Sequence, residues 1–405
     1  MPDIDITNVV AISVSTPPAG LSSYNINNLA YFTKESPLPD EETPRIPNGY
    51  AVYRTPSAVA ADWGTSSEVN QAAIAIFSQT PNILTGGGVF IVIPMLPSET
   101  LATAIARGKD LVYFGGILVG GFDPWEQEQE PPPEPPENPS VPAAASIFDE
   151  TIAASDLVQT MDKMLFLASP ELNSVIGAGL FAAIKDANNT HTRMLLYTQI
   201  GGSQNGHRLF AAAYAGRAMS TNFSGSNTTS TMHLKDLATI TPDPLITETW
   251  LEACRQVGAD VYVGIAGIPK TFTSGGNEFF DDVYNLLWFK GALEVAGFNA
   301  LATTSTKVPQ TEPGMSVLKG AYRLICEQAL TNGFISPGAW NSPEIFGDPE
   351  DFRRNIEERG YYIYSQPVNQ QSQPDREARK APLIQMAIKF TGAIHSSNLI
   401  IYINR

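Results

Sequence analysis

Hydrophobic residues near the start of the chain recur at every second position. Val10, Ile12 and Val14 alternate with small or polar residues, and two prolines at positions 17–18 end the run. A period of two is the signature of a β-strand, and a proline pair stops it. We therefore predict an extended N-terminal strand on an arm of residues 1–24.

The next patterned segment, residues 50–121, alternates between helical and extended periods. Thr55 precedes a proline and should begin a short helix that Gly64 ends. Thr65 and Glu68 have the spacing of a capping box, which predicts the start of a second helix. This stretch is therefore expected to begin with two helices.

Two apolar strand patterns follow, at residues 89–94 and 111–114. The segment between them is predicted to be a helix that begins at Ser98 and ends at Gly108. Strands joined by helices are typical of an α/β unit. We predict a small α/β domain over residues 25–122.

Residues 123–146 replace this pattern with prolines and glutamates. Polyproline is stiff, and a run of one charge repels itself, so the segment cannot bury enough apolar surface to fold alone. We predict an acidic linker or exposed loop here.

The longest section, residues 147–370, is predicted to be the main core domain. Its apolar strand patterns are residues 163–169, 193–199 and 259–267. Helical patterns separate these strands, which favours a largely parallel sheet covered by helices. Two further helices are expected at residues 277–296 and 315–330, the second ended by Gly333.

The last segment, residues 371–405, carries two more strand-like runs, at residues 383–390 and 393–405. In the final run, every second position after Asn398 is apolar: Leu399, Ile401 and Ile403. We predict C-terminal strands that end in an arm.

Each terminal strand is set apart from the body by a proline-bearing spacer. Such a strand can complete its own sheet, or it can add to the sheet of another copy, where main-chain hydrogen bonds bind it and alternation sets the register. The predicted fold class is α/β, with a mixed helix-covered sheet core, a smaller α/β domain and extended N- and C-terminal strand arms.

Charge and composition restrict the function. The 405 residues carry a formal net charge of -16, which disfavours nucleic acid and anionic membranes as partners. No apolar run reaches the roughly 20 residues needed to span a bilayer, and the first residues do not resemble a secretory signal. We expect synthesis in a cytoplasm, no membrane insertion, and two free, buried cysteines, Cys254 and Cys326.

Searching for catalytic or metal-binding motifs gives no converging set of residues. The four histidines are scattered, without metal-ligand spacing: His191, His207, His233 and His395. The glycine-rich stretches, at residues 85–88, 115–116, 120–121 and 201–203, fit neither a phosphate-binding loop nor a nucleophile elbow, and we interpret them as turns. The carboxylate pairs at residues 281–282 and 357–358 are interpreted as solvated helix faces. The polar stretch at residues 220–231 is expected to be a flexible surface loop.

Several C-terminal stretches resemble the tail sheath proteins of contractile phage tails. They are NGFISPGAWNSPE at residues 332–344, GYYIYSQPV at 360–368, TGAIHSSNLIIYINR at 391–405 and ALEVAGFNAL at 292–301. The N-terminal runs at residues 55–81 and 89–94 are similar to a shorter phage subgroup of the same family. The acidic proline segment departs from the resemblance.

The resemblance implies a structural protein that has no catalytic residues, no metal and no cofactor. Hexameric rings of such proteins stack helically around a tail tube, and the assembly contracts to drive the tube through a host cell envelope. Its partners would be other copies of the chain, the tube protein, the baseplate and the tail terminator. Its location would be the virion tail, assembled in the host cytoplasm.

Carried over to this sequence, the resemblance assigns Val10, Ile12 and Val14 to an N-terminal arm that links neighbouring copies. The C-terminal arm, which would link copies in the same way, would comprise Asn398, Leu399, Ile401 and Ile403. Lys319 and Arg323, four residues apart on a predicted helix, are candidates to face the tube. Two alternatives stay open: a soluble α/β enzyme that binds a small polar or phosphorylated ligand, and another tail structural component.

Overall fold

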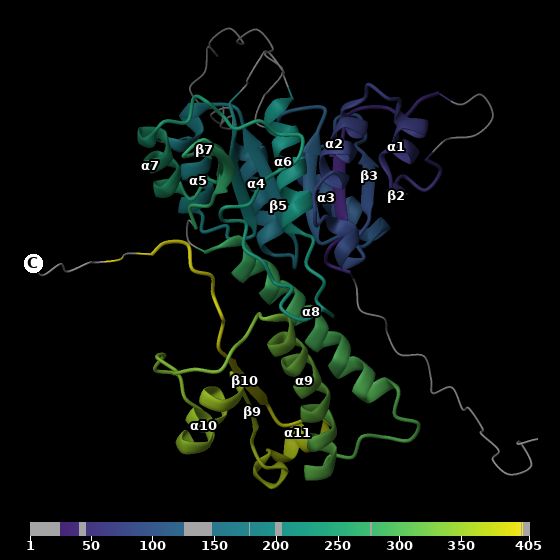
Figure 1. Ribbon diagram of the computed structural model, residues 1–405. Helices are drawn as coiled ribbons and strands as arrows, with labels where there is room; N and C mark the ends of the chain where they lie inside the picture. Colours follow the sequence, from purple (N-terminus) through teal and green to yellow (C-terminus); the bar gives the residue numbers. More distant parts are fainter. Residues whose placement is uncertain are drawn as a thin grey trace, which may run out of the picture. The chain divides into compact units, whose positions relative to one another are not determined.

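The structure is a computed structural model that describes residues 25–39, 46–124, 148–177, 179–198, 205–275, 278–397 and 399. These residues form two compact units (Figure 1). The first unit takes the described residues of 24–288, 331–334 and 390–405, and the second those of 289–330 and 335–389. Each unit has a hydrophobic core of its own.

One six-stranded sheet is the basis of the first unit. Its strands are β1 (Leu29–Thr33), β2 (Ala51–Tyr53), β3 (Phe90–Pro94), β4 (Gly116–Gly120), β5 (Met164–Ser169) and β6 (Thr192–Leu196). They lie in the order β2-β3-β1-β4-β5-β6, and only β2 is antiparallel to its neighbour. The sheet therefore takes strands from both sides of the acidic proline segment. Its order reverses between β1 and β4, which is the switch point of a doubly wound sheet.

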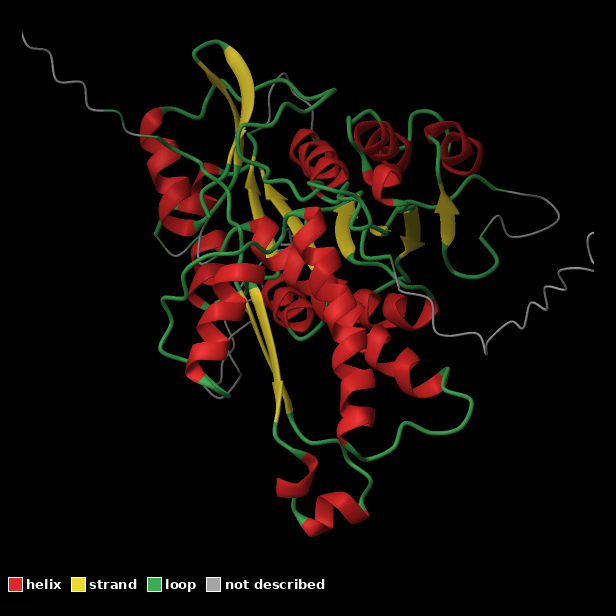
Figure 2. Ribbon diagram, turned by 60° about the horizontal axis from the view of Figure 1, so that its bottom comes forward, coloured by secondary structure: helices red, strands yellow, loops and turns green. Residues whose placement is uncertain are grey.

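Helices cover both faces of this sheet (Figure 2). The side chains of its strands alternate between the two layers. On β1, Leu29 and Tyr31 belong to the core under one layer, and Ala30 and Phe32 to the core under the other. The first layer contains α1 (Pro56–Trp63), α2 (Glu68–Phe77) and α6 (Gly206–Ala218), and the second contains α3 (Leu101–Leu111) and α4 (Asp149–Gln159). The period-two burial explains why these strands are apolar throughout.

Shorter elements complete the first unit. These are α5 (Leu180–Asp186), α7 (Glu248–Val257), the antiparallel pair β7 (Val261–Ile265) and β8 (Ile268–Phe272), and two 3-10 turns, η2 (Ile83–Gly86) and η3 (Leu172–Val175). Helices α5 and α7 pack with β7 around a third apolar cluster. Helix α8 (Phe280–Ala302) begins in the first unit and ends in the second.

The second unit is a small α/β assembly around two antiparallel strands. Its elements are the end of α8, most of α9 (Glu312–Asn332), α10 (Pro349–Arg359), β9 (Tyr361–Ser365), η4 (Val368–Gln370), α11 (Gln373–Glu377) and β10 (Ile384–Ile388). Strand β10 pairs with β9 from Ile384 opposite Ser365 to Ile388 opposite Tyr361.

Most elements expected from hydrophobic periodicity are confirmed, as is the α/β fold class. The strands at residues 89–94, 163–169 and 383–390 appear as β3, β5 and β10, and Thr55 and Gly64 bound α1 as expected. Helix α9 ends before Gly333, whose φ of 88° is left-handed. Cys254 and Cys326 are free and buried, as predicted.

Two predicted helix caps are wrong. Helix α2 is capped by Ser67, whose side chain accepts from the Asn70 amide, and not by Thr65. Helix α3 is capped by Thr100 and not by Ser98, because Ser98 has a φ of 62° and lies in the turn before the helix. Short runs rich in serine and threonine offer several caps, and tertiary contacts select one.

One predicted strand is wrong. Residues 111–114 lie at and after the end of α3, and the strand is instead β4, whose flanking glycines were interpreted as turns. A Cβ on Gly120 would lie 1.5 Å from the Tyr31 hydroxyl oxygen, so glycine is needed there for packing. The strand predicted within residues 259–267 is present as β7. Asp260, just before it, pairs in parallel with Leu195 of β6, whereas β7 itself forms an antiparallel pair with β8.

Among the described residues, no helix has both the length and the apolarity needed to cross a membrane.

Close packing beside β4 predicts that replacing glycine by alanine has opposite effects on the free energy of unfolding at two positions, Gly115 and Gly291. A Cβ on Gly115 would lie 1.9 Å from the Ile26 carbonyl oxygen, whereas a Cβ on Gly291 in α8 meets nothing within 4 Å. We expect Gly115→Ala to lower the free energy of unfolding by about 1–3 kcal/mol. Gly291→Ala should raise it by up to about 1 kcal/mol, because alanine favours the helix. Denaturant unfolding of both variants measures this, and equal effects would contradict the packing around β4.

Candidate assembly surfaces

The β9-β10 pair presents main-chain edges. Among the described residues, each strand pairs with a strand on one side only. Beyond the end of β10, the Ser336 amide donates to the Lys389 carbonyl, so that edge is partly covered, whereas the outer edge of β9 has no strand beside it in the described chain. An unpaired edge is a template for adding a strand from another chain.

Helix α9 supports one face of this pair. The Tyr361 hydroxyl donates to the Glu327 carboxylate, and Cys326 Sγ lies 3.7 Å from Met386 Sδ. Burial raises the pKa of the Cys326 thiol to about 12, so the group remains an apolar packing element. The sheet edge is thus held in place by packing and not by its strands alone.

Aromatic side chains cover the other face. The rings of Phe352 and Tyr362 lie 5.3 Å apart, and those of Phe346 and Tyr362 lie 5.7 Å apart. Trp340 packs edge-on against Phe352 at 5.3 Å. A two-stranded sheet is marginal by itself in water, and these two packed faces explain its stability.

The predicted arm residues lie mostly outside the described part of the chain. This applies to Val10, Ile12 and Val14 and to Asn398, Ile401 and Ile403. Leu399 is described and 81% exposed, and Ile394 is 92% exposed. These apolar side chains therefore stand in solvent at the start of the C-terminal arm.

Residues 391–395, which we name the arm root, are attached to the first unit. The Thr391 amide donates to the Phe334 carbonyl. The His395 ring stacks on His233 with centroids 4.4 Å apart, and its Nε2 lies 3.1 Å from the Thr231 hydroxyl. Burial lowers the pKa of both histidines, which favours the neutral rings that stack well. The arm root is therefore held against the first unit.

The stretch at residues 220–231, predicted to be a flexible surface loop, is instead tied down where it meets the end of α9. The amides of Thr228 and Thr229 donate to the Asn332 carbonyl, and the Asn332 side chain donates to the Phe223 carbonyl. Asn332 is fully buried. This loop therefore belongs to the packed body.

Lys319 and Arg323 lie on α9, in the second unit. Lys319 is half-buried and Arg323 is exposed, and the adjacent Leu324 is 71% exposed. The surface here therefore mixes basic and apolar side chains. Its role as a tube-facing surface stays a prediction.

Charged side chains fill the switch point of the sheet, where doubly wound folds commonly bind ligands. Arg208 of α6 binds Glu68 of α2 through two hydrogen bonds, of 2.7 and 3.0 Å, and Asp123 through one of 2.8 Å. His207 lies 2.6 Å from the same Asp123 oxygen. Glu35, after β1, accepts from the Glu68 and Val69 amides and so caps α2.

These groups compensate one another. Burial opposes the charge of Arg208, but its bonds to Glu68 and Asp123 outweigh that cost and raise its pKa. Burial likewise acts to raise the pKa of Asp123, while hydrogen bonds from His207 and Arg208 hold it below its usual value. A space of only about 10 Å³ remains beside Asp123 and Arg208. The switch point is therefore a structural ion network.

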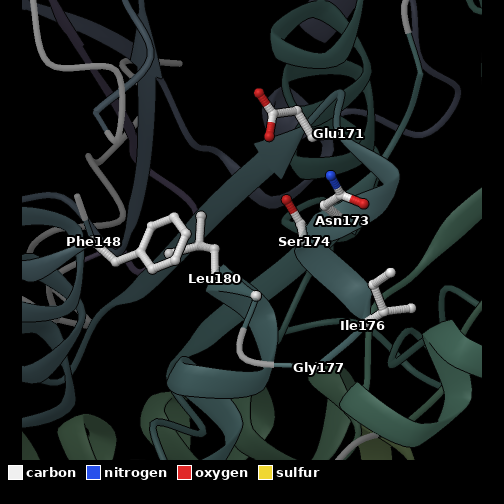
Figure 3. A pocket seen from close by; sticks show the side chains of 8 residues that line it. Phe148, Glu171, Asn173, Ser174, Ile176, Gly177 and Leu180 are labelled. Carbon is white, nitrogen blue, oxygen red and sulfur yellow. The ribbon is translucent and has the colours of Figure 1, made fainter. Parts of the chain in front are cut away.

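A larger hollow, of about 370 Å³, lies beside the turn that follows β5 (Figure 3). Glu171, Asn173 and Ser174 come from that turn, whereas Phe148 and Leu180 come from other elements. The hydroxyl of Ser174 is 2.6 Å from that of Ser169, which also accepts from the Glu171 amide. The lining includes one carboxylate, Glu171, and one side-chain hydroxyl, Ser174. Because the Ser174 hydroxyl is bonded to Ser169, it is not paired with Glu171 as a nucleophile is with its base.

Asp281 and Asp282, predicted to be a solvated helix face, are instead half-buried in the first turn of α8 and line a small polar pocket. Burial raises the pKa of Asp281 to about 6 and also raises that of Asp282. Residues of the arm root and of the 229–231 loop lie opposite these two carboxylates and shield them from solvent. The helical pattern alone predicted that they would be exposed. The pair at residues 357–358 is exposed, as predicted.

The described residues combine an ion network at the switch point, an open edge along β9 and an arm root held against the first unit. A comparison with known families adds to this. Residues 280–403, just under a third of the chain, match the family model for the E217 tail sheath protein gp31-like C-terminal domain. The match confirms the resemblance to phage tail sheath proteins over this part of the chain. A search of the curated proteins finds no match.

The matched segment begins at the first residue of α8 and includes the β9-β10 pair and the arm root. The family is structural and belongs to the tail of the virion. Sequence reasoning found the C-terminal pattern but missed the supporting sheet edge. The run of aromatic and β-branched residues at 361–364, within the quoted GYYIYSQPV stretch, was the signal that would have shown it.

Removing the shared cation of the switch point should strongly destabilise the first unit. Arg208→Met leaves Glu68 and Asp123 buried without their main counter-charge, and we expect a loss of about 3–5 kcal/mol in the free energy of unfolding. The loss should be smaller at about pH 4 than at about pH 7. In the variant, the buried carboxyl groups of Glu68 and Asp123 can bind protons at the lower pH, and neutral carboxyl groups need no counter-charge.

The matched control for this change is Arg255→Met. Arg255 and Glu252 form an exposed i,i+3 pair, whose removal should cost less than about 1 kcal/mol. Urea unfolding at both pH values compares the variants. Similar losses for Arg208→Met and Arg255→Met would show that the network does not hold the switch point together.

Proposed function

We propose that this protein is the building block of a contractile phage tail sheath. It polymerises as stacked hexameric rings around a tail tube, and the polymer contracts to drive the tube through a host cell envelope. The observation that supports this most is the packed β9-β10 pair with its open edge, inside the segment that matches the sheath family.

The proposed linkage is strand exchange between copies. The N-terminal arm, with Val10, Ile12 and Val14, and the C-terminal arm, from Asn398 through Ile403, add to the strand edges of neighbouring copies. Main-chain hydrogen bonds supply affinity, and the alternating apolar side chains supply register. Each copy would have two arms and the open edge of β9, so every copy can be both donor and acceptor.

Exchange of this kind is heterologous, and a heterologous contact that does not close produces open helical assemblies. Contraction is then a change between two packings of the bodies, while the strand linkage stays formed. The further partners that we propose are the tube protein, the baseplate and the tail terminator, and assembly takes place in the host cytoplasm.

A catalytic role has little support from the geometry. The switch point is occupied by Arg208 and its carboxylate partners, and in the hollow near Glu171 the Ser174 hydroxyl is bonded to Ser169 rather than to the carboxylate. We therefore propose a non-enzymatic function and set aside the α/β enzyme. The remaining alternative is another tail structural component. Such a protein could contain the same C-terminal domain, but it would not form tubular polymers.

Truncation tests the strand linkage. The full chain should form hollow tubular polymers that electron microscopy detects, and a chain that lacks residues 398–405 should stay as small species. Ile401→Pro should also block polymers, because proline lacks the amide that the ladder needs, whereas Ile401→Val should preserve them.

Normal polymers from the truncated chain would refute the strand linkage. A full chain that stays small and monodisperse at high concentration would refute the sheath function itself.

Charge reversal on α9 tests the tube-facing assignment. Lys319→Glu with Arg323→Glu should reduce co-assembly with the tube protein by at least about tenfold, since like charges across an interface cost several kcal/mol. Self-polymerisation should continue. Co-sedimentation measures both, with Arg353→Glu and Arg354→Glu on exposed positions of α10 as the matched control. An equal loss of co-assembly in the control variant would contradict the assignment of Lys319 and Arg323 to a tube-facing surface.

A further inference from the structure

The small polar pocket at the start of α8 has the composition of an ion site. It is lined by three parts of the first unit besides α8 itself: the 229–231 loop, residues 333–334 and the first part of the arm root, residues 391–393. Its volume is about 60 Å³, enough for an ion with a few waters. Oxygen atoms from separate segments are thus brought around one small space.

Three side chains of α8 line this pocket. Asp281 and Asp282 lie in the first turn, and Asn285 lies one turn further on the same side. Asn285 is only 6% exposed, and its Oδ1 has no hydrogen-bond partner. A buried amide oxygen normally has a partner, so this atom indicates a ligand that the protein itself does not supply.

The charge in the pocket is only partly compensated. The eleven described lining residues include two carboxylates and no basic side chain. Asp281 has a hydrogen bond to the Thr231 side chain, and Arg193 acts on it from outside the lining while bound at 2.5 Å to Asp260. His395, which acts on Asp282, is stacked on His233 and lies 3.1 Å from the Thr231 hydroxyl.

We infer that this pocket binds one hard divalent cation, Ca²⁺ in preference to Mg²⁺. Asp281, Asp282 and Asn285 supply side-chain oxygens, and the 229–231 loop and residues 391–393 can supply hydroxyl and carbonyl oxygens. Ca²⁺ accepts six to eight such oxygens in irregular geometry, whereas Mg²⁺ requires a near-ideal octahedron.

The types of side chain in the pocket also indicate which metal ions it would bind. No group of three or more His, Cys, Asp or Glu side chains suited to a metal gathers anywhere in the described residues. Two carboxylates completed by amide, hydroxyl and carbonyl oxygens suit a hard cation and not zinc or copper.

Acidic residues in the first turn of a helix also complement the helix dipole. That effect accounts for two carboxylates at this position, and exposed ones would serve it equally well. It does not account for their burial or for the unpaired oxygen of Asn285. The cation explains all three features together.

A bound cation would join α8 to the arm root. Residues 391–393 lead from β10 towards the predicted C-terminal arm, so the ion would fix the point from which the arm leaves. This consequence rests on the proposed sheath function, whereas the ion site itself does not.

Thermal unfolding of the full chain tests the site. After treatment with a chelator, millimolar Ca²⁺ should raise the midpoint by about 2–5 °C, and Mg²⁺ at equal ionic strength by less. Asp281→Asn should abolish the shift. In chelator this variant should unfold at the same temperature as the parent chain or higher, because it removes repulsion between neighbouring carboxylates.

Glu294→Gln is the matched control, since it removes one carboxylate from an exposed position of the same helix. It should keep the full Ca²⁺ shift. Equal shifts in Asp281→Asn and Glu294→Gln would reduce the effect to general screening of an acidic protein and overturn the inference, as would no shift in the parent chain.

Equilibrium dialysis with radioactive Ca²⁺ gives the stoichiometry. We expect one ion per chain, lost in Asp281→Asn and in Asn285→Leu and kept in Glu294→Gln. Binding by a chain that forms no tubes would refute the proposed function and leave this inference standing. Tubes that form without specific Ca²⁺ binding would refute the inference alone.

Discussion

Arg208 holds together the place where the sheet of the first unit changes direction. Its guanidinium joins α6 to Glu68 on α2 and to Asp123 after β4, and Glu68 in turn accepts from the Gly121 amide and the Tyr31 hydroxyl. Elements from both sides of the acidic proline segment therefore meet at one buried cation. This arrangement closes the site at which related architectures bind ligands, and it makes the body a support for other surfaces.

The surfaces that we propose for assembly lie at strand edges and chain ends. Main-chain groups at an edge bind any strand of suitable register, so recognition needs few specific side chains. The α9 helix and the aromatic face around Tyr362 hold that edge in shape. This explains why a search for short catalytic motifs returns so little, and why the sheath resemblance is carried by diffuse stretches of sequence.

Period-two and helical patterns predicted most elements, because burial on both faces of a sheet leaves a strong apolar signal. They failed where tertiary contacts decide the outcome. The glycines of β4 were interpreted as turns, although Gly120 is needed because the Tyr31 ring lies against it. Asp281 and Asp282 were interpreted as exposed, because the residues that bury them are about 50 positions before and 110 after them in the chain. Nothing local in the sequence encodes such contacts.

The arm root has a mechanical consequence. Tension applied to residues beyond 397 passes first through residues 391–395, which are attached by the Thr391 hydrogen bond to Phe334, the His395 ring stack and the Thr231 hydroxyl. The His395 ring also packs edge-on against Phe279. In the proposed sheath these contacts would lie in series with the strand ladder, so tension on the arm would load them before it reaches the rest of the body.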